Sequence, residues 1–305
     1  ERERAKIRGA FGLYLSPDVV ERLARNPELL QLGGEQREIT VMFTDVRGFT
    51  TISEQFDPHE LTRFMNRFLT PMTDLILSHR GTIDKYMGDA IMAFWNAPLA
   101  VDGHAAQACD TALAMQAGLR ALNVEWQAEA RAAGRQHIQV NIGVGLNTGR
   151  ASVGNFGSAQ RFTYYCLGDE VNLASRLEGQ CKTYGVGIII GENTRTQVPA
   201  FAALELDRIL VKGKTEPARL YALMGDATMA QSSAFRELAE RQEAFLDRYR
   251  AGGFVDAMEL IEDCETVAAA AGWQQSYYEM MRARIGELIA IPPVDWTGVY
   301  VAKEK

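Results

Sequence analysis

The chain has 305 residues, 47% of them hydrophobic and 23% charged, so it can bury a sizeable core in one large domain or two ordinary ones. This composition excludes global disorder and a very small scaffold. The formal net charge of −7, from 32 Lys and Arg against 39 Asp and Glu, disfavours a nucleic-acid binder.

The first elements are a linker and a strand. Residues 1 to about 36 are expected to form a helical linker, because Ile7, Phe11 and Tyr14 recur at helical spacing and Ser16-Pro17 can open a second short helix. Apolar residues then alternate with Thr and Met from Ile39 to Phe43, which predicts a strand that delivers Asp45 to its end.

A capped helix and a hairpin follow. Asp57-Pro58-His59-Glu60 has the pattern of a capping box with proline at the first helical position. Apolar residues share one helical face over residues 61–76, and Gly81 is expected to stop this helix. Strands are predicted at Thr82–Tyr86 and Ala90–Trp95, joined by a tight turn.

The remaining elements complete a mixed fold. They are a helix at Asp102–Leu122, a hairpin of Val140–Leu146 and Arg150–Phe156 turning at Asn147-Thr148-Gly149, a helix at Glu170–Thr183 and a strand at Val186–Ile190. The order β-α-β-β-α-β is typical of a ferredoxin-like α/β (α+β) core, extended at its C-terminal side. From about residue 226, amphipathic spacing indicates a small appendage of two or three helices. We therefore expect a linker (1–36), a core domain (37–225) and a helical appendage (226–305).

Two carboxylates are candidates for metal binding. Asp45 ends a strand and Asp89 lies in a hairpin turn, and neither position needs an acid for folding. Adjacent strands could bring both to one edge, where hard oxygen ligands suit Mg²⁺ or Mn²⁺ bridging phosphates. Taken alone, either residue is more simply interpreted as a solvated turn aspartate, and it is the two together in their contexts that favour a metal site.

A polar pair stands on the helix after Gly168-Asp169. Asn172 and Arg176 are four residues apart and so share a face. Arg offers a planar cationic fork suited to a phosphoryl group, and Asn can orient a ribose. The alternative is that both lie on the solvated side of an amphipathic helix.

Four strings of residues resemble the class III adenylate/guanylate cyclase catalytic domain, in its order and spacing, over about residues 37–225. They are Phe43-Thr44-Asp45-Val46-Arg47-Gly48-Phe49-Thr50, Lys85-Tyr86-Met87-Gly88-Asp89-Ala90, Gly168-Asp169-Glu170-Val171-Asn172-Leu173-Ala174-Ser175-Arg176 and Val211-Lys212-Gly213-Lys214. Leu15-Ser16-Pro17 and Leu32-Gly33-Gly34-Glu35 look like the linker that joins a membrane-anchored sensor to the cyclase domain in bacterial receptor cyclases.

The resemblance implies conversion of a nucleoside triphosphate to its 3′,5′-cyclic monophosphate and pyrophosphate at sites shared by two head-to-tail domains. The implied metal ligands for two Mg²⁺ or Mn²⁺ ions are Asp45, Asp89 and the carbonyl of Val46. From the partner subunit, Asn172 would position the ribose and Arg176 would stabilise the α-phosphoryl group, and Lys212 or Lys214 would hold the leaving phosphates. The amides of Gly48, Phe49 and Thr50 are expected to cradle the β- and γ-phosphates.

The purine is expected to be read by Lys85. Adenine presents an acceptor at N1 and guanine a donor, so a cationic Lys85 favours ATP. The family's second purine-reading position, usually Asp, Thr or Ser in adenylate cyclases, is Tyr165 here. Its phenol could accept a hydrogen bond from the adenine amino group, or its ring could pack in the core.

The expected protein is thus a homodimeric adenylate cyclase. The alternatives are a guanylate or relaxed-purine cyclase, suggested by Tyr165, and a catalytically silent nucleotide-binding or dimerisation module. Scattered cysteines without a Cys-x-x-Cys pair fit a reducing compartment, and no signal peptide or membrane span is predicted. Because the chain begins with Glu1 in a charged run, we expect a cytoplasmic fragment of a longer receptor, with membrane attachment only through a preceding region.

Overall fold

The computed structural model describes residues 33–158, 160–210, 216–273 and 275–301. Its contacts divide the chain into two compact units. The first contains the described residues up to Ile142 together with Leu146–Ser175, and the second contains Gly143–Gly145 and the residues from Arg176 onward. Residues 226–301 therefore group with part of the sheet. The predicted domain boundaries at 36 and 225 stay predictions.

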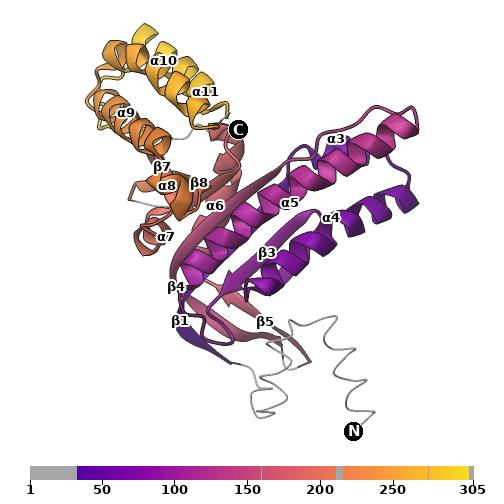
Figure 1. Ribbon diagram of the computed structural model, residues 1–305. Coiled ribbons are helices and arrows are strands. Elements are labelled where there is room, and N and C mark those ends of the chain that lie inside the picture. The colour runs from indigo at the N-terminus through magenta and orange to yellow at the C-terminus, as the bar shows by residue number, and fades with distance from the viewer. Residues whose placement is uncertain (1–32, 159, 211–215, 274, 302–305) are drawn as a thin grey trace. The chain divides into compact units, whose positions relative to one another are not determined.

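The first unit is a sheet with two long helices. Its strands follow the order β2-β3-β1-β4, with β5 paired to β4. This order, with α4 and α5 as the two crossovers, is the ferredoxin-like arrangement, so the expected fold class is confirmed. The helices α4 and α5 lie side by side against β1, β2 and β3 (Figure 1). The elements of this unit are β1 (Gly33–Val46), α3 (Phe49–Ser53), α4 (Pro58–Ser78), β2 (Thr82–Met87), β3 (Ala90–Trp95), α5 (His104–Ala132), β4 (Ile142–Ser158), β5 (Arg161–Leu167) and the start of α6 (Asp169–Tyr184).

The start of α4 confirms the predicted capping box. The Asp57 carboxylate accepts hydrogen bonds from the amides of His59 and Glu60, at 2.8 and 2.9 Å. The helix ends at Ser78, shortly before Gly81 as predicted, but Arg80, with φ of 64°, adopts the left-handed conformation at this end in place of Gly81. Gly81 is instead required by close packing, since a Cβ there would lie 2.6 Å from Ile76.

The predicted hairpin at Asn147-Thr148-Gly149 was also wrong, because β4 runs through these residues without turning. Asn147 and Thr148 are both buried, and their polar groups bond to other elements. The Asn147 amide donates to the Glu170 carboxylate at 2.8 Å, and the Thr148 hydroxyl bonds to Thr40 at 2.8 Å. These side chains serve as buried cross-links between elements, and β4 forms its hairpin with β5, a strand that the sequence patterns do not predict.

Two further element boundaries differ from expectation. The helix expected to end at Leu122 continues to Ala132 through residues with high helix propensity. Asn123, which interrupts the apolar pattern, is buried and donates to the Val140 carbonyl at 2.7 Å. Strand β1 begins at Gly33, and Gly154 of β4 approaches the backbone of Gly33 so closely that a Cβ would lie 2.2 Å from its carbonyl.

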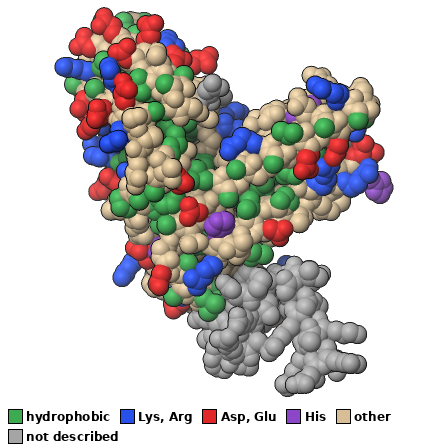
Figure 2. Space-filling view, in the orientation of Figure 1, with side chains coloured by type: hydrophobic (Ala, Val, Ile, Leu, Met, Phe, Trp, Pro, Cys, Tyr) green, Lys and Arg blue, Asp and Glu red, His purple; other side chains and the backbone are tan. Residues whose placement is uncertain are grey.

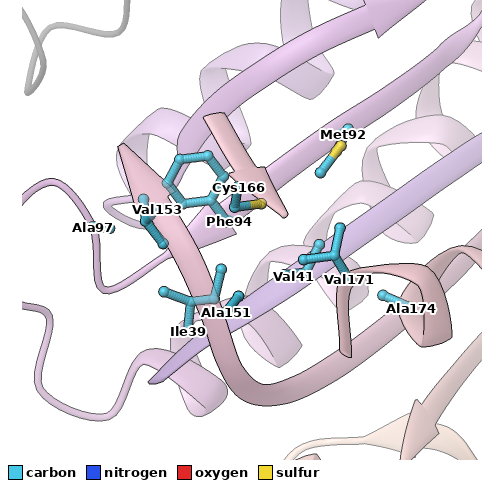
Figure 3. Close-up of a cluster of buried hydrophobic side chains, with 10 residues drawn as sticks. All are labelled: Ile39, Val41, Met92, Phe94, Ala97, Ala151, Val153, Cys166, Val171 and Ala174. Atoms are coloured by element: carbon cyan, nitrogen blue, oxygen red, sulfur yellow. The ribbon is translucent and has the colours of Figure 1, made fainter. Parts of the chain in front are cut away.

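One cluster of the first unit's core lies between the sheet and the first turns of α6. Figure 3 shows apolar side chains from β1, β3, β4, β5 and α6 that converge there. These residues are Ile39, Val41, Met92, Phe94, Ala97, Ala151, Val153, Cys166, Val171 and Ala174. All four cysteines are buried in the described structure.

The second unit carries the C-terminal helices. Its strands follow the order β6-β8-β7-β9, and the Val144 amide of β4 donates to the Gly187 carbonyl at 3.0 Å. Helix α9 packs on β7, and α10 packs on both α9 and α11. The elements are β6 (Ile188–Gly191), α7 (Glu192–Gln197), β7 (Ala202–Leu210), β8 (Ala218–Gly225), α8 (Ala227–Gln231), α9 (Ser233–Arg250), α10 (Phe254–Ala270), α11 (Tyr277–Ala290) and β9 (Tyr300–Val301).

Two expectations about partners concern the charge distribution on the surface and the hydropathy of the helices: that the chain binds no nucleic acid and that it contains no membrane span. On the face shown in Figure 2, acidic and basic side chains of the described residues are intermingled and no extended basic surface is visible. No helix in the described part of the chain has the length and hydropathy needed to cross a bilayer.

Candidate active site

Asp45 and Asp89 meet at one edge of the first unit's sheet. Asp45 lies near the end of β1, and Asp89 occupies the turn between β2 and β3. Because β1 and β3 pair with Thr44 opposite Ile91, the residues just beyond this pair reach the same edge. The Val46 amide donates a hydrogen bond of 3.2 Å to Oδ2 of Asp89. The structure thus brings together two carboxylates that are far apart in sequence.

The two carboxyl groups interact with each other. Asp45 is exposed by surface area, but its carboxyl group is partly surrounded by protein atoms. The pKa of Asp45 is raised to about 6, mainly because of this burial. The negative charge of Asp89 and a hydrogen bond between the two carboxyl groups raise it further. Adjacent carboxylates repel each other unless a proton or a cation lies between them.

The oxygen donors at this edge fit a hard divalent cation. Two carboxylates and a nearby backbone carbonyl are the ligand types that Mg²⁺ and Mn²⁺ prefer. Among the described residues, no group of three or more His, Cys, Asp or Glu side chains could hold a metal. A cation held by two carboxylates and one backbone carbonyl would keep coordination positions for water or phosphate oxygens, as magnesium sites at phosphates commonly do.

A sharp turn follows this edge. Gly48 has φ of 68° and ψ of 27°, a left-handed conformation that glycine adopts without strain. It precedes α3, and no side chain in the described structure caps the first amides of this helix. Phe49 and Thr50 are the first residues of this helix, and no described side chain accepts a hydrogen bond from their amides at the cap. These amides can therefore donate to a bound anion.

Lys85 lies on β2, the strand that leads to Asp89. Its side chain is half exposed, and its Nζ lies 3.5 Å from Oδ2 of Asp84 and 5.1 Å from the centroid of the Tyr165 ring. The Tyr165 ring packs edge-on against Phe156, with centroids 5.1 Å apart. Tyr165 is only partly buried, so its ring faces the Lys85 ammonium instead of packing in the core. A hydrogen bond from the adenine amino group to its phenol stays a prediction.

Helix α6 carries the predicted polar pair. Its buried stripe of Val171, Ala174 and Leu177 is confirmed. Asn172 is exposed and Arg176 is half-buried, one turn apart on this helix. Both side chains thus lie off the buried stripe, where a ligand or a partner surface can reach them.

The first unit also contains a cavity of about 390 Å³. It is formed between α3, α4, the C-terminal end of α5 and the following loop, and its floor includes Phe56, Phe64 and Trp126. None of the predicted site residues lines it, so the motif residues do not form a closed pocket there.

Residues 34–225 match the family described as the adenylate and guanylate cyclase catalytic domain. The chain belongs to this family.

Named relatives of this cyclase domain are adenylate cyclases. The domain is 33% identical over 216 residues to Adenylate cyclase 1 of Rhizobium meliloti and 36% identical over 189 residues to an adenylate cyclase of Anabaena cylindrica. These matches cover 70% and 61% of this chain but only 32% and 36% of the relatives. The chain therefore spans about a third of the length of these two relatives.

Solved structures include cyclases for both purines. The adenylyl cyclase CyaB from P. aeruginosa is 34% identical with a TM-score of 0.58, and the match covers 64% of this chain and 97% of that one. The guanylyl cyclase Cya2 is 33% identical with a TM-score of 0.57, covering 64% and 95%. A bacterial light-regulated adenylyl cyclase at 21% identity and a TM-score of 0.63 shares the fold.

Several predicted parts of this cyclase domain fall outside the described residues. Lys212 and Lys214 lie between the described ranges, as do the linker residues 1–32 at the N-terminal end. The motifs do not single out two residues that lie beside Lys85 and Tyr165, namely Asp84 and Phe156. Asp84 is recognisable only once the bulge in β2 is known, and Phe156 only once β4 and β5 are paired.

Proposed function

We propose that this domain is an adenylate cyclase that converts ATP to 3′,5′-cyclic AMP and pyrophosphate, at sites formed by two copies of the chain. The observation that carries the proposal is the meeting of Asp45 and Asp89 beside the strand that bears Lys85. The names of the relatives in Rhizobium meliloti and Anabaena cylindrica agree with this activity.

Asp45 and Asp89 would hold two Mg²⁺ or Mn²⁺ ions, with the Val46 carbonyl as a further ligand. When bound, the ions would neutralise the triphosphate and the charge that develops during attack by the 3′-hydroxyl. The two carboxylates fit this task because their mutual repulsion is relieved by a cation. The amides of Gly48, Phe49 and Thr50 would donate to the β- and γ-phosphate oxygens.

The partner copy would complete the site. Its Asn172 would orient the ribose so that the 3′-oxygen faces the α-phosphorus, and its Arg176 would donate to the α-phosphoryl oxygens as negative charge accumulates. Lys212 or Lys214 would hold the leaving pyrophosphate. The reaction needs positioning and charge neutralisation more than a strong protein base, and these residues supply both.

Lys85 would select the purine. Its ammonium donates to N1 of adenine, whereas N1 of guanine carries a hydrogen and repels a donor. A guanylate or relaxed-purine cyclase is the second candidate, because Tyr165 replaces the usual acceptor and Cya2, a guanylyl cyclase, is 33% identical.

The test is a product assay on the purified chain. ATP and GTP are supplied separately with Mg²⁺ or Mn²⁺, and the cyclic products are quantified by chromatography. We expect cyclic AMP as the main product, none with Asp45→Ala, and unchanged yield with Asp74→Asn, a matched loss of one exposed carboxylate on α4. Equal product from the wild type and Asp45→Ala would contradict the proposal, and a larger yield from GTP would favour the second candidate.

A further inference from the structure

The strand β2 contains an irregularity at the purine-reading position. Ile83 pairs with Ala93 and Lys85 pairs with Met92, so Asp84 is an extra residue in β2 relative to β3. Such a bulge re-aims the side chains on either side of it. In a regular strand Asp84 and Lys85 would point to opposite faces, but here their charged groups lie 3.5 Å apart.

The Asp84 carboxylate in this bulge is buried and lacks hydrogen bonds to other described residues, which is unusual for an acidic side chain. Its side chain has no exposed surface, and neither carboxylate oxygen has a hydrogen-bond partner in the described structure. The 3.5 Å contact with Lys85 is longer than an ordinary hydrogen bond, and it is the one ion pair of Asp84 among the described residues. A buried carboxylate without hydrogen bonds destabilises a fold, which points to a role other than stability.

The Lys85 ammonium also contacts an aromatic ring. Tyr165 pairs with Gly154 across the β4–β5 hairpin, and Phe156, two residues along β4, lies on the same face. Phe156 meets the Tyr165 ring edge-on, which fixes the orientation of that ring. The centroid of the Tyr165 ring is 5.1 Å from Nζ of Lys85, within the range of a cation–π contact.

We propose that Asp84 and Tyr165 are positioning residues that hold the Lys85 ammonium in place and thereby set the preference for ATP over GTP. This inference rests on the proposed function. A free lysine side chain has several rotatable bonds and could turn away from the N1 hydrogen of guanine. An ammonium held between a carboxylate and an aromatic ring stays close to N1 of the purine. It therefore donates to N1 of adenine and is repelled by the N1 hydrogen of guanine. Tyr165 then acts through Lys85, and its hydroxyl is not required.

The first test compares variants by the ratio of kcat/KM for ATP to kcat/KM for GTP. Asp84→Asn removes the charge, Tyr165→Leu removes the ring, and Tyr165→Phe removes only the hydroxyl. We expect the first two to lower the ratio about 3- to 30-fold, the range that one such contact supplies, and Tyr165→Phe to retain the preference. A merely structural role would lower both rates alike and leave the ratio unchanged, which would overturn the inference.

The second test is a double-mutant cycle with Lys85→Ala. If Asp84 and Tyr165 act through Lys85, neither Asp84→Asn nor Tyr165→Leu changes the ratio further in the Lys85→Ala background. Additive effects would overturn the inference. If Tyr165→Leu fails to fold, as judged by circular dichroism, the Asp84→Asn arm of the cycle decides alone.

The inference can fail separately from the proposed function. If the wild type forms no cyclic product, the same ratio is measured as the relative affinity for non-cyclising analogues of ATP and GTP. A ratio that falls in Asp84→Asn supports the positioning role even without turnover. A wild type that binds both analogues equally would overturn it.

Discussion

The backbone amide of Val46 donates a hydrogen bond of 3.2 Å to the carboxylate of Asp89, which joins the end of β1 to the turn between β2 and β3. Asp45 is next to Val46 in sequence, so this bond holds the two acidic side chains at one place. Oδ2 of Asp89 accepts this bond, and a further hydrogen bond joins the Asp89 and Asp45 carboxyl groups. The backbone at the end of β1 therefore helps to position the acidic pair.

The acidic pair leads to the first prediction. Asp45→Asn and Asp89→Asn keep the size of the side chain, and the amide oxygen that Asp89→Asn introduces can still accept from the Val46 amide, so both variants are expected to fold. Each should lower kcat roughly 100-fold or more, the loss typical of removing one electrostatic group from a site. Turnover with saturating Mn²⁺, beside circular dichroism of each variant, checks this. Activity within a few-fold of the wild type in either variant would contradict the assignment.

Asp84 gives a prediction about pH. Burial raises its pKa from 3.8 to about 6, against the opposing charge of Lys85, while the Cys166 thiol of β5, which also faces it, stays neutral because burial raises the pKa of that thiol. Between pH 3.8 and about 6 the Asp84 carboxyl is therefore protonated in the folded chain and ionised in the unfolded chain. Because of this difference, the free energy of unfolding falls as the pH rises through this range. Above this range the loss is on the order of 3 kcal/mol.

Asp84→Asn is accordingly expected to be more stable than the wild type at about pH 7.5, with a difference that shrinks as the pH is lowered towards about 4. Urea denaturation at several pH values measures it. A variant that is less stable than the wild type at the higher pH would contradict the prediction. Together with the expected loss of ATP preference, a gain in stability would identify Asp84 as a residue kept for function at the expense of stability.

A buried ion pair gives the third prediction. In the second unit, Arg284 of α11 donates to Oδ2 of Asp207 in β7 at 2.5 Å, and the Tyr184 hydroxyl donates to the same oxygen at 2.6 Å. Arg284→Met leaves the Asp207 charge buried without its cation and should lower the free energy of unfolding by about 3–5 kcal/mol. The double variant with Asp207→Asn should recover much of this loss. A single variant as stable as the wild type in urea would show that α11 does not depend on this pair.

Local signals predicted the elements of the fold well. The capping box of Asp57 and Glu60 depends on residues three apart, so the sequence contains all of its information. The alternation from Ile39 to Phe43 likewise identified a strand, and the motif around Asp45 and Asp89 identified the acidic pair before their proximity was visible.

The wrong predictions concern residues whose local structure is determined by tertiary contacts. Asn147, Thr148 and Gly149 have the composition of a turn, but the first two are satisfied by Glu170 and Thr40. At Gly149 a Cβ would lie 2.5 Å from Glu170, so this glycine serves packing inside a strand. Asp84 escaped notice for a related reason, since its burial and its contact with Lys85 follow from a bulge that has no local signature.

The central claim is that each active site takes Asp45 and Asp89 from one copy of the chain and Asn172 and Arg176 from another. Co-expression of Asp45→Ala with Arg176→Ala, each inactive alone, tests it most directly. In equal mixtures about half of the dimers would pair one variant with the other and contain one intact site, so about a quarter of the wild-type activity should return. A mixture as inactive as either variant alone would contradict the claim.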